Sequence, residues 1–268
     1  MPNLAILLAP AERKQPGGNP FAPDMFDYRT SGTFNFFEDL NPERRKLIDT
    51  LHGIIEDTDE EELGAIFGLE GPELDEAIRV DSEIYDAPLM SALDRFSPGV
   101  MYASMDFANL PTGAQRRLLE NGIILSGLFG LLRPDDLIPN YQLGMDTELP
   151  EIGKVTDFWR PNISPVLNKA LDGRFVWDLL PDVHRSAWDD ERTYEARVQV
   201  QFLDDGEPPE PDRYKVLCGK LVNFVVRETA EDLEELHEWE APQGYTFDED
   251  ASSFDEDTKT WTVVMVKS

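Results

Sequence analysis

The spacing of apolar residues predicts a helical layer in the first third of the chain. An Asn-Pro pair at 41–42 is typical of a helix start, and the apolar residues after it recur every three or four positions. This pattern predicts a helix over 42–56. Shorter helical segments follow, separated by glycine or aspartate, and predict three more helices at 60–67, 72–78 and 88–96.

The rest of the chain alternates apolar runs with helical segments. The run from Leu4 to Ala9 predicts a first strand, and the proline- and glycine-rich segment 12–27 predicts a loop, a common place for a functional site. The segments 195–203 and 214–217 have the alternation of a β-hairpin. Further strands are expected at 100–102, 122–126, 175–179 and 261–266, and further helices at 111–119, 155–170 and from 229.

The organisation of the sequence favours one domain over residues 1–268. No internal repeat, heptad run or long linker divides it. Hairpins mixed with helices are typical of the α+β class, here with a mixed or antiparallel sheet surrounded by helices. With 268 residues, 41% of them hydrophobic, the chain can bury a sizeable core.

Several features indicate a cytoplasmic protein. The longest apolar run, 123–132, is broken by a serine and two glycines and is too short to span a membrane. The first strand lacks the basic flank and the cleavage site of a secretory signal. One cysteine, Cys218, and three histidines can form neither an internal disulfide nor a Cys/His metal site. We therefore expect no membrane partner, no metal and no cofactor.

Acidic residues far outnumber basic ones. The chain has 54 Asp and Glu against 24 Lys and Arg, for a formal net charge of −30. A solvated acidic surface in an organism with an acidic proteome, a surface that attracts cations or basic partners, and a set of acidic loops all fit this composition. In each case the surface as a whole disfavours phosphate groups, so contact with nucleic acid requires a local basic cleft.

Common catalytic motifs are absent, and two longer blocks resemble a known family instead. The sequence has no Walker loop, no G-x-G-x-x-G after a strand, no H-E-x-x-H and no G-x-S-x-G. Residues 125–145, LSGLFGLLRPDDLIPNYQLGM, closely resemble the signature of the YaaA family, and residues 8–14, LAPAERK, resemble its N-terminal loop. Further agreement at 87–102, 158–168 and 244–253 extends the resemblance over nearly the whole chain.

The resemblance carries expectations about function. It implies a cytoplasmic bacterial protein that protects against hydrogen peroxide by limiting free iron and hence Fenton damage. It also implies the YaaA-type fold, with a helix-hairpin-helix-like element and a basic cleft that binds double-stranded DNA. Departures from the pattern concern this cleft, because Gln142 and Asn223 stand where the family usually has basic residues. Each lost phosphate contact weakens DNA binding at ordinary salt.

Three charged residues are candidates for catalysis. Glu12 and Lys14 share the first loop, where an acid beside a lysine activated by desolvation can transfer protons. Lys220 follows a predicted strand among apolar residues, which hints at a partly buried lysine. Solvated loop charges, and a lysine stem that covers the sheet, are the structural alternatives.

Four residues are candidates for binding a ligand or nucleic acid: Arg133, Asp136, Tyr141 and Arg160. The guanidinium of Arg133 lies in a turn-rich segment and suits a phosphate or carboxylate, while an internal salt bridge with Asp135 or Asp136 is equally plausible. Tyr141 can stack on a ligand or donate a hydrogen bond, although a tyrosine is more often part of the core. Arg160, next to a tryptophan, can stack over a ligand.

These residues leave different classes of function open. One is a stress-response binding protein whose cleft holds DNA or a phosphorylated ligand through Lys14, Arg133, Arg160 and Lys220. Another is an enzyme on a small phosphorylated or nucleoside-like metabolite, with Glu12 or Asp136 as general acid or base and a lysine as cation or nucleophile. Direct iron binding by surface carboxylates is a third, less favoured because scattered acidic loops rarely form a selective iron site.

Overall fold

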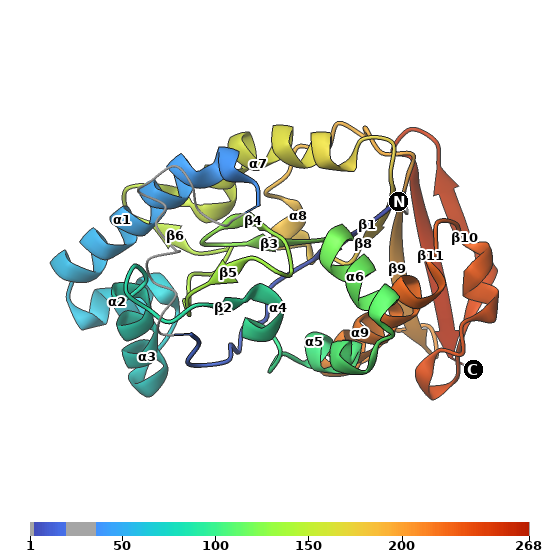
Figure 1. Ribbon diagram of the computed structural model, residues 1–268, viewed down its shortest axis with the longest axis horizontal. Helices are drawn as coiled ribbons and strands as arrows, with labels where there is room; N and C mark the ends of the chain where they lie inside the picture. Colours follow the sequence, from blue (N-terminus) through green and yellow to red (C-terminus); the bar gives the residue numbers. More distant parts are fainter. Residues whose placement is uncertain (1–2, 20–35, 268) are drawn as a thin grey trace.

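Seven strands form a mixed sheet in the order β10-β11-β9-β8-β1-β3-β4 (Figure 1). The computed structural model describes residues 3–19 and 36–267. The strand pairs β3/β1, β1/β8, β8/β9 and β9/β11 are parallel, whereas the two edge pairs, β10/β11 and β3/β4, are antiparallel. The strands span Leu4–Leu8 (β1), Gly122–Ser126 (β3), Gly130–Leu132 (β4), Phe175–Asp178 (β8), Ala196–Asp204 (β9), Tyr245–Asp255 (β10) and Thr260–Lys267 (β11).

Strand β1 lies inside this sheet, between β8 and β3, and is buried along its whole length. It pairs with β3 through Ile6 and Gly122, and with β8 through Ile6 and Trp177. A strand between two parallel neighbours is covered on both faces, which explains its unbroken apolar run. Because β1 pairs in parallel with β3 on one side and with β8 on the other, the carboxyl ends of these three strands meet at one edge of the sheet. In open sheets this arrangement marks the usual place for a ligand.

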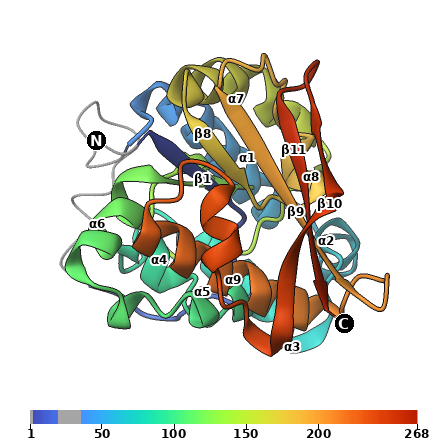
Figure 2. The ribbon, with the colours of Figure 1, turned by 90° about the vertical axis from the view of Figure 1, so that its right-hand side faces the viewer.

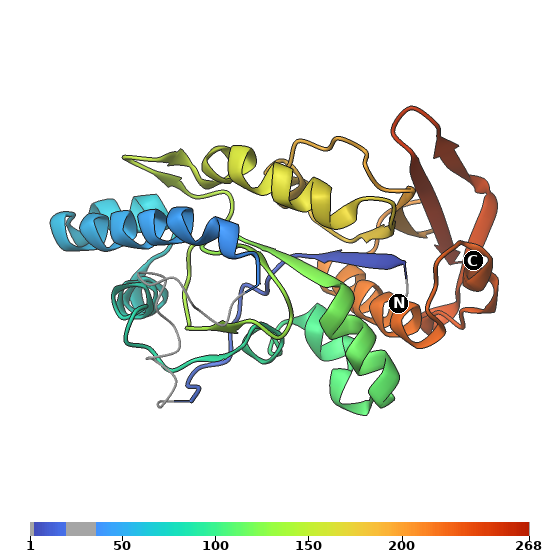
Figure 3. The same ribbon diagram turned by 45° about the horizontal axis from the view of Figure 1, so that its top comes forward.

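Helices cover both faces of the sheet. Helix α7 lies on one face, and α5, α6 and α9 lie on the other (Figure 2). Helices α1, α2 and α3 form a group at the opposite end of the molecule from β10 and β11, beyond β4 (Figures 1 and 3). The helices span Asn41–Asp57 (α1), Glu60–Phe67 (α2), Gly71–Ser82 (α3), Ala92–Arg95 (α4), Val100–Met105 (α5), Thr112–Asn121 (α6), Val155–Leu171 (α7), Asp182–Arg185 (α8) and Pro211–Glu228 (α9).

Short elements connect these layers. Strands β2 (Met90–Ser91) and β5 (Leu137–Ile138) form one two-stranded sheet, and β6 (Glu148–Leu149) and β7 (Gly153–Lys154) form another. Four short 3-10 helices lie at Glu38–Leu40 (η2), Phe107–Asn109 (η3), Glu234–Glu238 (η4) and Pro242–Gly244 (η5) within the described residues. In the part of the chain that the structure describes, no helix is long and apolar enough to cross a membrane.

The structure confirms the α+β class with a mixed sheet, and most of the predicted elements. Helices α1, α2, α3, α6 and α7 and strands β1, β3, β8 and β11 lie where the sequence predicts them. The helix-hairpin-helix-like element stays a prediction. The predicted loop at 12–27 can be followed only to residue 19, because 20–27 lie outside the described residues.

Several segments differ from the prediction. The expected strand at 100–102 is the start of helix α5, and the expected strand at 214–217 lies inside α9. Residues 217, 218, 221, 222, 225 and 226 of α9 are all buried, and this spacing is helical, so a window of four residues was too short to show the period. Strand β9 therefore pairs in parallel with β11 instead of forming a hairpin. Thr229, the expected start of a helix, ends α9 instead.

Two further segments also depart from the prediction. Of the helix predicted at 88–96, only the single turn of α4 is helical, and it follows the short strand β2. Strand β10 was not predicted, because its acidic stretch resembles a solvated loop in sequence.

Helices α5 and α9 approach each other so closely that only glycine fits at the contact. A β-carbon on Gly219 would lie 2.2 Å from the main-chain oxygen of Met101 and 3.0 Å from the nitrogen of Met105. Both of these main-chain atoms belong to helix α5, so they cannot move aside as a flexible side chain could. Gly219 therefore sets the spacing of the layer under β1 and β8.

We predict that Gly219→Ala lowers the free energy of unfolding by about 3 kcal/mol, because α5 and α9 must move apart. Urea denaturation measures the change. Gly53→Ala is the matched control, since Gly53 also lies inside a helix but has no atom within 4 Å of its added β-carbon. This control should raise stability by about 0.5–1 kcal/mol. Equal effects of the two substitutions would contradict the close approach.

Candidate functional site

The segment 9–19, called loop 9–19 below, crosses the carboxyl edge of the sheet directly after β1. The hydroxyl of Tyr102 donates to the main-chain oxygen of Ala9 at 2.8 Å. Further along, the main-chain nitrogen of Asn19 donates to the main-chain oxygen of Leu89 at 2.7 Å. A β-carbon on Gly99 would come within 2.4 Å of the side chain of Ala11, so the loop lies tightly against the turn before α5. These contacts fix the position of Lys14 inside the loop.

Arg95 of α4 joins loop 9–19 to two other segments. Its side chain is fully buried and donates to the main-chain oxygens of Gln15, Pro88 (3.0 Å) and Ile138 (3.2 Å). Its own main-chain oxygen accepts from the nitrogen of Gln15 at 2.7 Å. The Nε atom has no hydrogen-bond partner among the described residues. Burial lowers the pKa of this guanidinium to about 10.

Asp81 brings a carboxyl group into the same region from the last turn of α3. The buried face of this helix runs through Leu74 and Ala77 to Asp81, so the aspartate occupies a position where an apolar residue is expected. Its Oδ1 accepts from the main-chain nitrogen of Gln142 at 2.8 Å, whereas Oδ2 has no partner among the described residues. The side chain is fully buried, and burial raises its pKa from 3.8 to about 7, against the effects of the Gln142 hydrogen bond and of Lys14.

Tyr141 contributes a buried aromatic ring beside loop 9–19. Its hydroxyl is 2.7 Å from the Oγ of Ser126, the last residue of β3. The rings of Phe96 and Phe129 meet Tyr141 edge-on, with centroids 6.5 and 5.1 Å away. Burial raises the pKa of the tyrosine hydroxyl, which therefore stays protonated at neutral pH.

The amine of Lys14 lies over the ring of Tyr141. Its Nζ is 4.6 Å from the centroid of the Tyr141 ring and donates to the main-chain oxygen of Glu12 at 3.3 Å. Burial lowers the pKa of Lys14 from 10.5 to about 8; the negative charges of Asp81 and Glu12 oppose this shift, and the Arg95 guanidinium adds to it. We call Lys14, Asp81, Arg95 and Tyr141 the Lys14 cluster.

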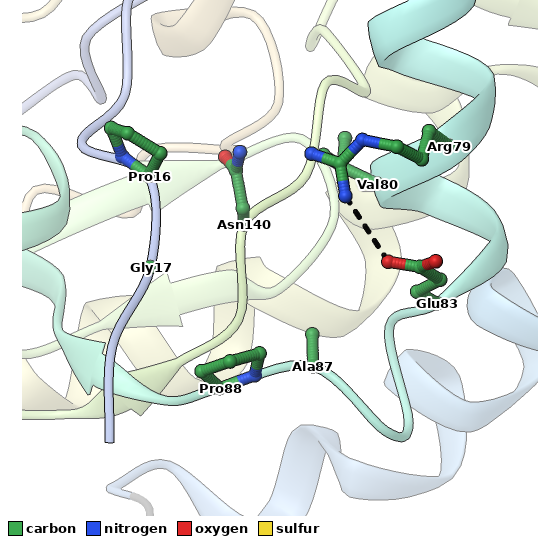
Figure 4. Close-up of a pocket in the computed structure, with 8 residues that line it drawn as sticks. All are labelled: Pro16, Gly17, Arg79, Val80, Glu83, Ala87, Pro88 and Asn140. Atoms are coloured by element: carbon green, nitrogen blue, oxygen red, sulfur yellow. Dashed lines mark hydrogen bonds and ion pairs between the residues drawn. The ribbon is translucent and has the colours of Figure 1, made fainter. Parts of the chain in front are cut away.

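A small cavity of about 60 Å³ is lined in part by Pro88, whose main-chain oxygen accepts a hydrogen bond from Arg95 of the Lys14 cluster. Three of its lining residues are sequence neighbours of the cluster or of its hydrogen-bond partners: Pro16 follows Gln15, Val80 precedes Asp81, and Asn140 precedes Tyr141. The volume is enough for a few water molecules. Figure 4 shows the cavity, with Arg79 bonded to Glu83 at 3.2 Å. The lining residues are Pro16, Gly17, Arg79, Val80, Glu83, Ala87, Pro88 and Asn140.

Of the residues that the sequence singles out, Lys14 and Tyr141 belong to this cluster. Glu12 adjoins it through its main chain, but its carboxylate is exposed and lies 3.9 Å from Lys215. Lys220 lies elsewhere, on α9 and not after a strand, and lines a groove with Phe224 and other residues.

Arg133 and Asp136 hold the turn between β4 and β5. The guanidinium of Arg133 donates to the main-chain oxygen of Leu119 at 2.7 and 3.1 Å, pairs with Asp135 at 3.3 Å and stacks over Phe36. The carboxylate of Asp136 is buried and accepts from the main-chain nitrogens of Arg133 (2.7 Å) and Phe36 (2.8 Å). The internal salt bridge that the sequence allowed is thus present with Asp135.

Arg160 lies on α7 and is also held by its own neighbourhood. Its guanidinium donates to the main-chain oxygen of Ser186 at 2.8 Å and pairs with Asp157 at 3.0 Å.

Cys218 is buried in α9, and burial raises the pKa of its thiol to about 12. This thiol is therefore protonated and unreactive at neutral pH.

Sequence reasoning missed Asp81 and Arg95. The predicted helix at 72–78 ends before Asp81, although the apolar positions 74 and 77 continue in register to 81. A carboxyl group on the apolar face of a helix was the available signal. Arg95 directly follows another charged residue, Asp94, so no comparable signal marks it in the sequence.

The Lys14 cluster suits proton exchange with a bound molecule. Near neutral pH both the Asp81 carboxyl and the Lys14 amine exist in both protonation states, which is the condition for efficient general acid and base catalysis. Within the described residues, no group of three or more His, Cys, Asp or Glu is placed to hold a metal ion.

Comparison with known proteins places the chain among a set of bacterial relatives. A family model described as "Peroxide stress protein YaaA" matches residues 4–251. A UPF0246 protein of Streptomyces coelicolor is 32% identical over 141 residues, which are 52% of this chain and 53% of that protein. A UPF0246 protein of Flavobacterium johnsoniae is 32% identical over 58% of this chain and 63% of its own length. One from Idiomarina loihiensis is 27% identical over 80% and 88%.

We predict that Asp81→Asn changes how stability depends on pH. The carboxyl has a higher pKa in the folded chain, about 7, than its ordinary 3.8, so its contribution to stability is complete below pH 3.8 and is lost as the pH rises through 7. The variant should therefore gain stability relative to the wild type between pH 4 and 7, with a constant difference above pH 7. Urea denaturation at a series of pH values measures this gain. Asp75→Asn, an exposed position on the same helix, is the control and should show no such trend.

Proposed function

Because the chain belongs to the peroxide stress protein YaaA family, we propose that it limits oxidative damage by acting on a small molecule at the Lys14 cluster. The damage in question is of the iron-dependent Fenton type, as the resemblance implies. The site is that of an enzyme, with Asp81 as general acid or base and Lys14 as cation or nucleophile. Asp81 takes the place of Glu12 and Asp136, whose carboxylates are respectively exposed and bound in a turn.

One observation supports this proposal most strongly: two fully buried charged side chains each keep one polar atom without a partner among the described residues. These atoms are Oδ2 of Asp81 and Nε of Arg95. A buried polar group that lacks a hydrogen bond costs about 1–3 kcal/mol, and more when it is charged. Such groups occur at functional sites, where a ligand supplies the missing partner.

The contrast with a second buried carboxylate supports this view. Asp178 ends β8 at the same edge of the sheet and is equally buried. It accepts from the main-chain nitrogen of Leu180, from Arg185 and from Gln199, each at 2.9–3.0 Å. Asp178 is therefore fully used in holding the fold, whereas Asp81 has an acceptor left for a substrate.

A small phosphorylated or nucleoside-like metabolite fits this site better than DNA does. The amine of Lys14 supplies the cation that a phosphate requires. A duplex, by contrast, needs several exposed basic groups along its backbone. Arg133 and Arg160 are occupied by internal hydrogen bonds and ion pairs, and Lys220 lies on a groove whose rim includes four glutamates.

We predict that Lys14→Met and Asp81→Asn each weaken binding of the preferred ligand at least about tenfold, as expected for the loss of a charged hydrogen-bonding partner. Calorimetric titration of nucleoside monophosphates and sugar phosphates identifies the ligand and measures the loss. Lys46→Met is the matched control, because Lys46 also lies over an aromatic ring, Phe158 at 5.7 Å, but on α1.

The same variants test the link to peroxide in cells. In a bacterial strain without its own family member, the wild-type protein and Lys46→Met should restore growth in hydrogen peroxide, whereas Lys14→Met should not. Full protection by Lys14→Met would show that the cluster is not where the protein acts.

We predict that duplex DNA does not bind at physiological salt. Fluorescence anisotropy of a labelled duplex should stay unchanged at about 0.15 M salt, where a net charge of −30 still repels a polyanion over roughly 8 Å. A shift that weakens steeply with salt and disappears in a Lys14→Ala/Lys220→Ala double variant would favour the DNA-binding function instead.

A further inference from the structure

We propose that the amine of Lys14 is a covalent nucleophile that forms an imine with a small aldehyde or ketone. This inference rests on the proposed function, because it assigns a substrate class and a chemical step to the same site. It goes beyond proton transfer, in that the lysine itself becomes bonded to the substrate.

The surroundings of Lys14 favour the loss of its proton. Within the described residues, its Nζ has no carboxylate within ion-pair distance, only the main-chain oxygen of Glu12 at 3.3 Å and the face of Tyr141. Lys215 and Lys267 differ in this respect, since Lys215 lies 3.9 Å from Glu12 and Lys267 lies 3.6 Å from Asp204. A lysine without a close counter-ion, in a partly desolvated place, loses its proton more easily.

The pKa of Lys14 agrees with this geometry. At a pKa of about 8 instead of 10.5, the neutral amine at pH 7 is about 300 times more abundant. Only the neutral form has the lone pair that attacks a carbonyl carbon.

Asp81 completes the reaction as the proton carrier. The lone pair of Nζ attacks the carbonyl carbon, and a proton passes from nitrogen to oxygen to give a carbinolamine. Protonated Asp81 then donates through Oδ2 to the hydroxyl group, the carbon–oxygen bond breaks, and water leaves. The second proton of the nitrogen returns to Asp81, so that amine and carbonyl give imine and water without any further reactant.

The position of Asp81 suits this proton transfer. Its Oδ1 is fixed by the main-chain nitrogen of Gln142, which leaves Oδ2 as the free oxygen in the buried cluster. The unpartnered Nε of Arg95 provides a donor for a second oxygen of the substrate. Together these groups fit a carbonyl compound that carries an oxygen-rich group next to its carbonyl.

Trapping with a reducing agent tests the proposal. The full chain is incubated at pH 7 with glyoxylate, glycolaldehyde or glyceraldehyde 3-phosphate, whose aldehydes stand beside a carboxylate, a hydroxyl or a phosphate-bearing chain. Sodium cyanoborohydride reduces any imine to a stable secondary amine, and peptide mass spectrometry locates it. We expect one adduct per chain, on Lys14, formed at least about tenfold faster than on any other lysine.

Two variants show whether Asp81 takes part. Asp81→Asn should slow the adduct on Lys14 at least about tenfold, while Lys46→Arg, the control, should leave its rate unchanged. Circular dichroism and thermal unfolding establish that each variant is folded. Lys14→Arg should abolish the specific adduct.

The outcomes separate this inference from the proposed function. Adducts spread over the exposed lysines, or none on Lys14 with any of the three aldehydes, would overturn the covalent step. If calorimetry still shows binding that depends on Lys14 and Asp81, the proposed function survives that result. If that binding is absent too, both proposals fail.

Discussion

The guanidinium of Arg95 is the contact on which the candidate site depends. It is fully buried, and it binds the main-chain oxygens of loop 9–19, of the segment before β2 and of β5. Hydrogen bonds from a charged donor are worth about 1.5–3 kcal/mol each, so these three contacts hold together segments as far apart in the sequence as Gln15 and Ile138. Lys14 and Tyr141 are placed by two of those segments, and both positions follow from the planar geometry of one side chain.

The sheet supplies the rigid frame for this contact. Strand β1 is buried between two parallel neighbours, so the start of loop 9–19 cannot shift without breaking pairs on both sides. The last residue of β3, Ser126, then holds the hydroxyl of Tyr141. The amine of Lys14 and the ring of Tyr141 thus meet beside the ends of the strands, while α3 contributes Asp81 from outside the sheet. A site assembled in this way keeps its geometry while it leaves polar atoms unpaired.

The sequence predicts the frame better than the site. Long segments with a clear period, such as α1 and α7, lie where the sequence predicts them, because periodicity over many residues outweighs local propensity. Within α9 the sequence predicts a strand at 214–217, because four residues are too few to show the helical period of its buried positions. Lys14 and Tyr141 were identified through the family blocks. Asp81 and Arg95 could not be placed beside them, because their proximity depends on hydrogen bonds between residues distant in sequence.

The acidity of the chain acts differently on different ligands. Counter-ions screen charges over about 8 Å at physiological salt, so a small ligand with one or two charges feels mainly the groups nearest to it. In the cluster these groups are Lys14 and Arg95 against Asp81, and the pKa of Asp81 is high enough for its carboxyl to be partly neutral. A duplex spans the whole surface and meets its repulsion at every phosphate. The net charge of −30 therefore excludes polyanions more strongly than small molecules, and a half-buried lysine in a strongly acidic protein is a selective arrangement.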